Sequence, residues 1–317
     1  MKAVLGPYPP PYAGTELVVR EEFEELGRDG FLIGTSIIPV ELDDRILIRR
    51  SRFVINGPAL IYQIMRRRRQ IDSISAHFAT TFGYVARIAK ILFDIPYTVT
   101  CHGTDALINL KRKPHSYFTR KALQGADTVY AVSESVKDSL LIGGVPESKI
   151  ELVHRKIGKA FSGKKVKRKN QVIFVGSVHH IKGIDTLLTA FAEFSKKNTN
   201  FSLKIVGRIA DPHYLKLLKN LSEELRISEK VHFVGEMPHD HLPRYLNESK
   251  LFVMPSRSEG YGRALDEALS CGLPAVATNV GGLPEVAKGR NCILVEPELP
   301  GQMANAMQRA LKGREHK

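Results

Sequence analysis

The sequence contains little cysteine and no long hydrophobic run. Its 317 residues include three cysteines, Cys101, Cys271 and Cys292, which are too few and too scattered for a disulfide framework or a zinc cage and indicate a reducing, cytoplasmic environment. No uninterrupted apolar stretch approaches the roughly 20 residues that a membrane-spanning helix needs. A proline-rich stretch beginning at Pro7 follows the first six residues, so we expect no secretory hydrophobic region.

The composition excludes several classes of protein. Apolar residues make up 43% of the chain and charged residues 25%, as in soluble globular proteins, which excludes a disordered, a collagen-like or a disulfide-dense miniature protein. A single hydrophobic core stops growing at about 250–300 residues, so the length favours two domains.

The net charge is unusual. Lys and Arg number 47 against 33 Asp and Glu, which gives a formal charge of +14, and both halves of the chain are positive. A positive protein attracts the phosphates of nucleotides, nucleic acids or anionic lipid headgroups, and the composition does not choose among them.

The pattern along the chain predicts an α/β protein, because short apolar runs alternate with helical patterns. We expect strands at residues 3–5, 74–76, 97–101, 128–131 and 151–153, and then at 172–175, 203–206, 231–234, 251–254, 275–277 and 293–295. Between the two series, residues 155–169 hold eight basic residues and no acidic one, which favours a solvated linker over a phosphate-binding strip. We therefore predict two facing Rossmann-like, doubly wound parallel-sheet domains, residues 1–158 and 159–317.

The most informative stretch is residues 251–286, LFVMPSRSEGYGRALDEALSCGLPAVATNVGGLPEV. A buried strand leads into a loop that contains Gly260 and Gly262, and a helix follows. Glycines allow close backbone approach, and amides at a helix N-terminus point at an anion, so the loop predicts a phosphate cradle without a Walker lysine. About one turn into the helix, Glu267 is placed to accept hydrogen bonds from vicinal hydroxyls such as those of a ribose.

Glu259 and Glu267 are eight residues apart. A helix would separate them by about 12 Å at roughly 1.5 Å per residue, which exceeds the about 5–9.5 Å between the paired carboxyls of a glycoside hydrolase. The two carboxylates are therefore predicted to contact different parts of one ligand, and the alternative is a surface helix with ordinary solvated glutamates.

This block resembles the E-x7-E region of the large retaining glycosyltransferase family four, which has the GT-B fold. Residues 172–191, VIFVGSVHHIKGIDTLLTAF, are similar to the family's strand-glycine-lysine-glycine-helix block, and residues 95–105, IPYTVTCHGTD, to its strand ending in a His-Gly pair. Residues 8–16, YPPPYAGTE, resemble its first glycine loop. The resemblance covers nearly the whole chain and is most specific in the C-terminal block.

The resemblance implies a retaining hexosyltransferase that moves a sugar from a nucleotide-diphosphate-sugar donor to a hydroxyl acceptor on a glycan or a lipid-linked molecule. We expect no cofactor, and no metal ion for the leaving group, because the sequence has no Asp-x-Asp spacing that would hold a metal on the diphosphate. The C-terminal domain would hold the donor, with Glu267 on the ribose and Glu259 on the sugar hydroxyls. The diphosphate would be held by the ammonium of Lys182 and by the amides of Gly260, Tyr261 and Gly262. The N-terminal domain would bring the acceptor, the Gly14 amide and His102, so His102 and Glu259 are the predicted catalytic residues.

The sequence departs from the family pattern at one position that matters for the diphosphate. Ser177 stands where the family commonly has an arginine directly after the strand glycine. One cation is therefore missing, unless His179, His180 or another residue of the cleft compensates for it.

Eight arginines and no acidic residue lie between Arg45 and Arg69, with apolar residues among them. We expect a helix that opens at Gly57-Pro58 and closes at Arg66–Arg69, where the helix dipole favours cations. The patch is interpreted as a solvated basic terminus or as a contact with an anionic membrane at the inner face, because basic clusters gain about 1 kcal/mol per residue near such a surface. Nucleic acid is the least favoured partner, because no binding module accompanies the charge.

Two alternative functions stay open at this point: a nucleotide-sugar epimerase, and a non-catalytic protein that binds a nucleotide-sugar or nucleic acid. Residues 239–241, His-Asp-His, have the side chains of a metal site, but polar turn residues are expected between a strand and a helix.

Overall fold

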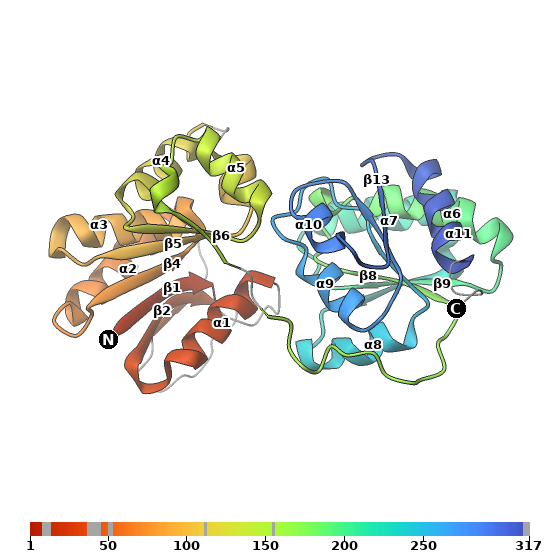
Figure 1. The fold of residues 1–317 in the computed structure, drawn as a ribbon, viewed down its shortest axis with the longest axis horizontal. Helices are drawn as coiled ribbons and strands as arrows, with labels where there is room; N and C mark the ends of the chain where they lie inside the picture. The colour runs from red at the N-terminus through yellow and green to blue at the C-terminus, as the bar shows by residue number, and fades with distance from the viewer. Residues whose placement is uncertain (8–13, 37–45, 50–52, 111–112, 154–155, 313–317) are drawn as a thin grey trace. The chain divides into compact units, whose positions relative to one another are not determined.

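The computed structural model describes residues 1–7, 14–36, 46–49, 53–110, 113–153 and 156–312. The chain divides into two compact units, Met1–His154 and Arg155–Lys317. Each unit is built on one parallel β-sheet with helices packed against it (Figure 1).

The N-terminal unit contains a seven-stranded sheet in the order β3-β2-β1-β4-β5-β6-β7, and all its strand pairs are parallel. Its strands are β1 (Lys2–Pro7), β2 (Gly30–Ser36), β3 (Ile46–Arg49), β4 (Ser73–His77), β5 (Tyr97–Cys101), β6 (Thr128–Ala131) and β7 (Ile150–Leu152). Its helices are α1 (Gly14–Leu26), α2 (Phe53–Arg67), α3 (Tyr84–Phe93), α4 (His115–Gly125) and α5 (Glu134–Ile142). Alternate side chains of β1 enter different cores: Ala3 and Leu5 pack with α2 to α5, and Val4 packs with α1.

The C-terminal unit contains a six-stranded parallel sheet in the order β10-β9-β8-β11-β12-β13. Its strands are β8 (Gln171–Val175), β9 (Ser202–Val206), β10 (Val231–Gly235), β11 (Leu251–Met254), β12 (Ala275–Thr278) and β13 (Cys292–Val295). Its helices are α6 (Ile184–Lys197), α7 (Pro212–Glu224), α8 (Leu242–Glu248), α9 (Arg263–Ser270), α10 (Leu283–Ala287) and α11 (Pro300–Lys312). One face of the sheet packs against α6, α7 and α11, and the other packs against α8, α9 and α10.

Both sheets reverse their strand order once. The reversal lies between β1 and β4 in the N-terminal unit and between β8 and β11 in the C-terminal unit. In a doubly wound sheet, ligands bind outside the carboxyl ends of the strands at this switch point. The loops that leave β8 and β11 are therefore neighbours where a ligand is expected.

The prediction of an α/β protein with two doubly wound parallel sheets is confirmed, and every strand that we expected is present to within about two residues. The sequence analysis missed β2 and β3. Residues 46–48 were interpreted as apolar residues within a basic patch, because a short edge strand flanked by arginines lacks the apolar context of the buried strands.

One expectation is wrong. Helix α2 begins at Phe53 and not at Gly57-Pro58, so Pro58 is its sixth residue, where a proline removes the backbone bond to the carbonyl four residues earlier and its ring crowds that carbonyl. The basic segment is largely exposed, as expected of a solvated linker. It is also anchored at two points: Phe161 is buried in the core beside β8, and the Arg168 guanidinium donates to the carbonyls of Cys271 and Gly272.

Candidate functional site

The predicted diphosphate lysine lies on the short turn between β8 and α6. Lys182 ends a 3₁₀ turn, His180–Lys182, and Gly183 follows with a φ of 62°. A Cβ on Gly183 would lie 2.1 Å from the carbonyl oxygen of Pro255, which follows β11. Only glycine therefore lets this turn approach the loop after β11 so closely.

That approach brings two predicted site residues into contact. The Lys182 Nζ lies 2.5 Å from Glu259 Oε2, and the two side chains are only 19% and 15% exposed. The hydroxyl of Ser256 lies 3.5 Å from the same carboxylate oxygen. A partly buried ion pair thus joins residues that the sequence places 77 positions apart.

The backbone carbonyl of Glu259 contacts two glycines of the segment after β12. The amide of Gly282 donates to the Glu259 carbonyl at 3.2 Å. Gly281 has a φ of 54°, and a Cβ on it would lie 1.7 Å from the same carbonyl oxygen. The position of Glu259 therefore depends on the absence of a side chain at residue 281.

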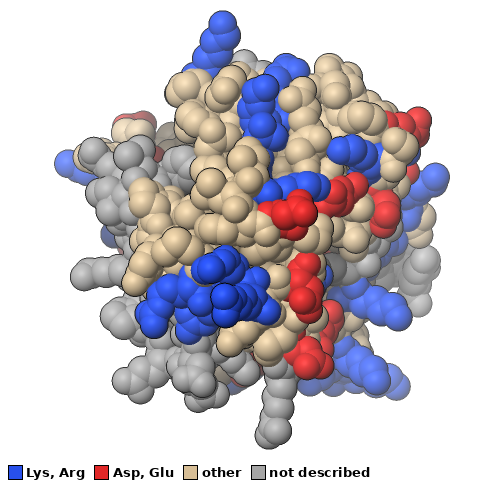
Figure 2. Space-filling model, turned by 90° about the vertical axis from the view of Figure 1, so that its left-hand side faces the viewer, with Lys and Arg blue, Asp and Glu red and all other residues tan. Residues whose placement is uncertain are grey.

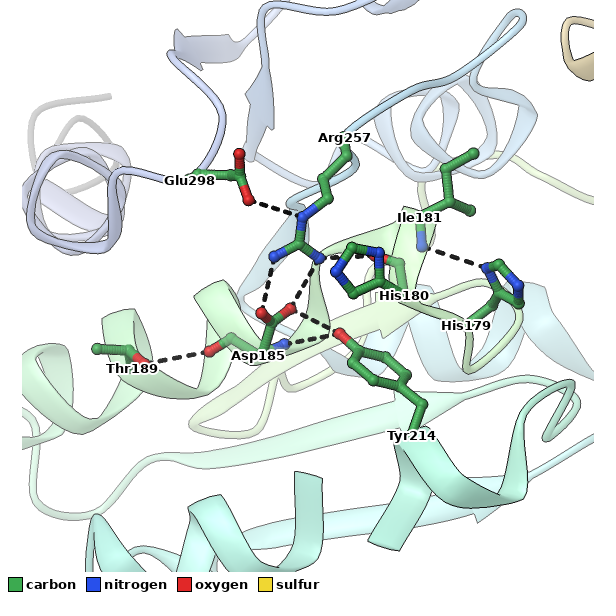
Figure 3. Close-up of polar contacts among 8 residues, drawn as sticks. All are labelled: His179, His180, Ile181, Asp185, Thr189, Tyr214, Arg257 and Glu298. Atoms are coloured by element: carbon green, nitrogen blue, oxygen red, sulfur yellow. Dashed lines mark hydrogen bonds and ion pairs between the residues drawn. The ribbon is translucent and has the colours of Figure 1, made fainter. Parts of the chain in front are cut away.

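An arginine braces the two loops against each other (Figure 3). The Arg257 guanidinium donates twice to the Asp185 carboxylate, at 3.0 and 2.7 Å, and also to Glu298 and to the His180 carbonyl. Burial raises the pKa of Asp185, but the hydrogen bonds from Arg257 and Tyr214 outweigh burial and hold this pKa below its ordinary value. The turn that carries Lys182 is therefore fixed to the strand end that carries Glu259.

The predicted ribose carboxylate lies on α9. Gly262 caps this helix with a φ of 98°, and a Cβ there would lie 2.4 Å from Leu283 Cδ2. Glu267 is nearly buried, and its Oε1 lies 2.8 Å from His239 Nε2 and 3.0 Å from Arg263 Nε. His239 was considered only as a metal ligand in the sequence; here it contacts the predicted ribose residue. Among the residues whose positions are described, no three His, Cys, Asp or Glu side chains form a metal-binding group.

The remaining predicted residues of this loop are less exposed than a loop residue usually is. Gly260 and Gly262 are buried, and Tyr261 is half-buried. The Tyr261 hydroxyl donates to Asp266 at 2.8 Å, and burial followed by this hydrogen bond raises the pKa of the phenol. Tyr261 therefore anchors the loop to α9 through its side chain.

The strand end that lacks the family's arginine has another arginine beside it. The amide of Val178 donates to the carbonyl of Arg208 at 2.8 Å, so Ser177 and Arg208 follow adjacent strands, β8 and β9. The Arg208 Nε is buried and has no hydrogen-bond partner in the part of the chain that the structure describes. The sequence analysis missed this residue, because neither its spacing nor a motif marks it.

In the N-terminal unit, Gly14 is the first residue of α1, and residues 8–13 before it lie outside the described residues. His102 directly follows β5 and is half-buried. The buried carboxylate of Asp105 accepts the amides of His102, Gly103 and Ala106 at 3.1–3.2 Å. Burial raises the pKa of Asp105. The Asp105 carboxylate thereby fixes the backbone at His102.

The basic surface of the N-terminal unit is described only in part, since Arg45, Arg50 and Arg52 lie outside the described residues. At the end of α2, Arg66, Arg68 and Arg69 are exposed, and Figure 2 shows a dense group of basic side chains on this side of the unit. Four large apolar side chains of α2 and α3 are also exposed: Tyr62, Met65, Ile91 and Leu92. Over the residues that can be described, no helix is long and apolar enough to cross a membrane.

Solved structures with the same architecture define the class of fold. The chain aligns with Anabaena HepE in complex with UDP and glucose at a TM-score of 0.85 and 18% identity, over 99% of this chain and 91% of that chain. Sucrose-phosphate synthase from Thermosynechococcus elongatus gives a TM-score of 0.80 at 21% identity, over 98% and 90% of the two chains. The predicted two-domain α/β fold of GT-B type is thus confirmed.

The chain belongs to the family "Glycosyl transferases group 1", whose profile matches residues 157–317, and the profile "Glycosyltransferase Family 4" matches residues 16–157. An uncharacterized glycosyltransferase of Methanocaldococcus jannaschii is 29% identical over 74% of this chain and 63% of its own length. D-inositol 3-phosphate glycosyltransferase of Corynebacterium jeikeium is 33% identical over the same shares, 74% and 63%. The chain thus spans less than two thirds of the length of these curated relatives.

The glycine that holds Glu259 gives a testable prediction. Gly281→Ala is expected to lower the free energy of unfolding by more than the about 1–2 kcal/mol that a left-handed backbone costs an alanine, because its Cβ also meets the Glu259 carbonyl. Gly289→Ala is the matched control, since Gly289 has a φ of 71° and open space around its Cβ position. Urea unfolding of both variants measures the difference, and equal losses would show that the contact with Glu259 is unimportant.

Proposed function

We propose that this protein is a retaining glycosyltransferase that moves a sugar from a nucleotide-diphosphate-sugar to a hydroxyl acceptor. The observation that carries the proposal is the Lys182–Glu259 ion pair at the switch point between β8 and β11. It places one cation and one carboxylate side by side where a doubly wound sheet binds its ligand. The cation can bind a diphosphate, and the carboxylate can accept hydrogen bonds from sugar hydroxyls.

Binding of the donor separates the Lys182–Glu259 ion pair and gives each side chain a new partner on the donor. Its diphosphate takes the Lys182 ammonium and the amides of the loop at residues 260–262, and Glu259, released from Lys182, accepts hydrogen bonds from the sugar. Glu267 holds the ribose hydroxyls, with its Oε1 already oriented by Arg263 and His239. Each of these interactions is charge-assisted and therefore stronger than a neutral hydrogen bond.

The chemistry follows from stabilising the departing diphosphate and positioning the acceptor hydroxyl. No enzyme nucleophile is proposed, because Glu259 is committed to the sugar hydroxyls once the donor is bound. The acceptor therefore attacks on the face that the diphosphate leaves. The N-terminal unit is proposed to bind the acceptor and to contribute the Gly14 amide and His102. The His102 side chain would contact the sugar near the bond that breaks. Neither a cofactor nor a metal ion is needed, and transfer is expected to persist in EDTA.

The relatives support this choice over the alternatives. One solved relative is described as a complex with UDP-glucose, and it aligns with this chain at a TM-score of 0.83. The family's members are named for glycosyl transfer, which favours a transferase over an epimerase or a non-catalytic binding protein. Sugar release that does not depend on any acceptor would favour the epimerase instead.

The first test is a screen of UDP- and GDP-sugars for thermal stabilisation, since a ligand at 100 times its Kd adds about 2.7 kcal/mol. With the best donor, Lys182→Met is expected to weaken diphosphate binding by roughly 10- to 100-fold, the value of one hydrogen bond to a charged group. Glu259→Gln is expected to lower kcat while the nucleotide still binds. Lys197→Met and Glu193→Gln, both exposed on α6, are the matched controls.

We further propose that Arg208 replaces the arginine that is missing at Ser177. Its carbonyl accepts from Val178, its backbone leaves the same end of the sheet as Ser177, and the buried Nε lacks a partner. A buried donor without a partner costs free energy, which a bound anion would recover.

Arg208→Met is therefore expected to raise the Kd of a nucleoside diphosphate by roughly tenfold, and the loss should shrink as salt is added. Lys216→Met, an exposed site on α7, controls for the change of net charge. Titration calorimetry measures both variants. Equal affinity in the two variants would remove Arg208 from the donor site.

The exposed arginines at the end of α2, with Tyr62, Met65, Ile91 and Leu92 nearby on α2 and α3, are proposed to contact an anionic membrane that carries a lipid-linked acceptor. Replacing Arg66, Arg68 and Arg69 with alanine is expected to weaken binding to phosphatidylserine vesicles by about 3 kcal/mol, at about 1 kcal/mol per residue. Replacing Lys164, Lys165 and Lys167 removes the same charge elsewhere and is the control. Co-sedimentation that falls equally in both triple variants would contradict a specific contact through α2.

A further inference from the structure

A continuous chain of polar contacts leads from His102 into the N-terminal unit. His102 Nε2 lies 2.9 Å from His77 Nδ1, and His77 Nε2 lies 3.0 Å from Glu22 Oε2. Lys2 Nζ lies 3.0 Å from the other carboxylate oxygen of Glu22. The three partners come from the end of β4, from α1 and from β1, so elements on both sides of the switch point contribute.

The carboxylate at the inner end of this chain is ionised. Burial raises the pKa of Glu22, but hydrogen bonds from His77 and the Ser75 hydroxyl and the charge of Lys2 together lower this pKa far below its usual range. An ionised carboxylate only accepts hydrogen bonds. The nitrogen of His77 that faces Glu22, Nε2, must therefore carry a proton.

The direction of the next hydrogen bond follows from the first. In a neutral imidazole one nitrogen donates and the other accepts, so a proton on His77 Nε2 leaves a lone pair on His77 Nδ1. With His77 neutral, His102 Nε2 donates to His77 Nδ1. The other ring nitrogen of His102, Nδ1, is in turn an acceptor.

The rings have little freedom to leave this arrangement. His77 is fully buried, the two imidazoles are stacked with centroids 5.1 Å apart, and the Phe78 ring lies 5.2 Å from His102. Phe78 has a φ of 72°, a conformation that bulky residues rarely adopt and that persists only where the surroundings enforce it.

We propose that His77 is neutral, with Lys2 as the cation beside Glu22, and that Glu22 and His77 are positioning residues that fix His102 in its Nε2–H tautomer. His102 Nδ1 then accepts a hydrogen bond from a hydroxyl of the substrate. This inference rests on the proposed function, in which His102 contacts the sugar. A serine-protease triad uses a carboxylate to fix the tautomer of one histidine; here the same effect is transmitted through a second histidine.

Glu22→Gln tests the chain of tautomers in the full-length protein. Lys2 attracts the amide oxygen of the new side chain, so its NH₂ group faces His77 Nε2 and donates. That reverses both rings: His77 carries its proton on Nδ1, and His102 carries its proton on Nδ1 as well. Long-range ¹H–¹⁵N correlation spectra of histidine-labelled protein distinguish the two tautomers, and His77→Asn and His102→Asn assign the signals.

Kinetics with the best donor provide the second readout. Because His102 Nδ1 becomes a donor in place of an acceptor, kcat of Glu22→Gln is expected to fall on the order of tenfold, the cost of one hydrogen bond, with a smaller change in KM. Glu24→Gln is the matched control, since Glu24 lies on the same helix, is 53% exposed and pairs at the surface with Arg20. In a His77→Asn background, Glu22→Gln should change His102 no further, because the link between them is absent.

The outcomes separate this inference from the proposed function. An unchanged His102 tautomer in Glu22→Gln, or a kcat equal to that of Glu24→Gln, overturns the positioning role even when the wild type transfers sugar. Reversed tautomers in a protein that turns over no nucleotide-sugar overturn the proposed function and leave the Glu22–His77–His102 chain established.

Discussion

The candidate donor site depends on the close approach of two loops that leave adjacent parallel strands. A lysine after β8 and a glutamate after β11 form an ion pair only because Gly183 and Gly281 carry no side chain where the backbones meet. Arg257 then ties the lysine turn to the strand end through Asp185. The close approach of the two backbones is therefore the condition for the ion pair.

The sequence was sufficient to predict the central strands of both sheets, because buried parallel strands are continuous apolar runs. The local patterns of the glycine loops marked Lys182 and Glu259 as candidate site residues, but they did not predict that the two side chains pair. The sequence was not sufficient for β2, whose apolar run is interrupted by glycine, or for the edge strand β3, which arginines flank. The start of α2 was missed because a proline is usually the first residue of a helix and here is the sixth.

The residues that the sequence analysis missed share one property: each acts through a tertiary contact and has no motif of its own. Arg208 lies beside Ser177 only because β8 and β9 are adjacent. Glu22 reaches His77 only because α1 packs beside β1, next to β4. Local patterns report which residues end a strand, whereas the order of the strands decides which of those ends become neighbours.

The ion pair also bears on which ligand the proposed donor site prefers. Lys182 and Glu259 are both largely withdrawn from water, so removing the partner of either leaves a charge that is costly to bury. In the proposed complex, a nucleoside diphosphate without a sugar would take the Lys182 ammonium from Glu259 and leave that carboxylate with the Ser256 hydroxyl, 3.5 Å away. A nucleotide-sugar would satisfy both groups. Its diphosphate would pair with the Lys182 ammonium, and its sugar hydroxyls would donate to Glu259 in place of that ammonium. The proposed function therefore implies a preference for the activated sugar over the nucleoside diphosphate, and such a preference would help the product to leave.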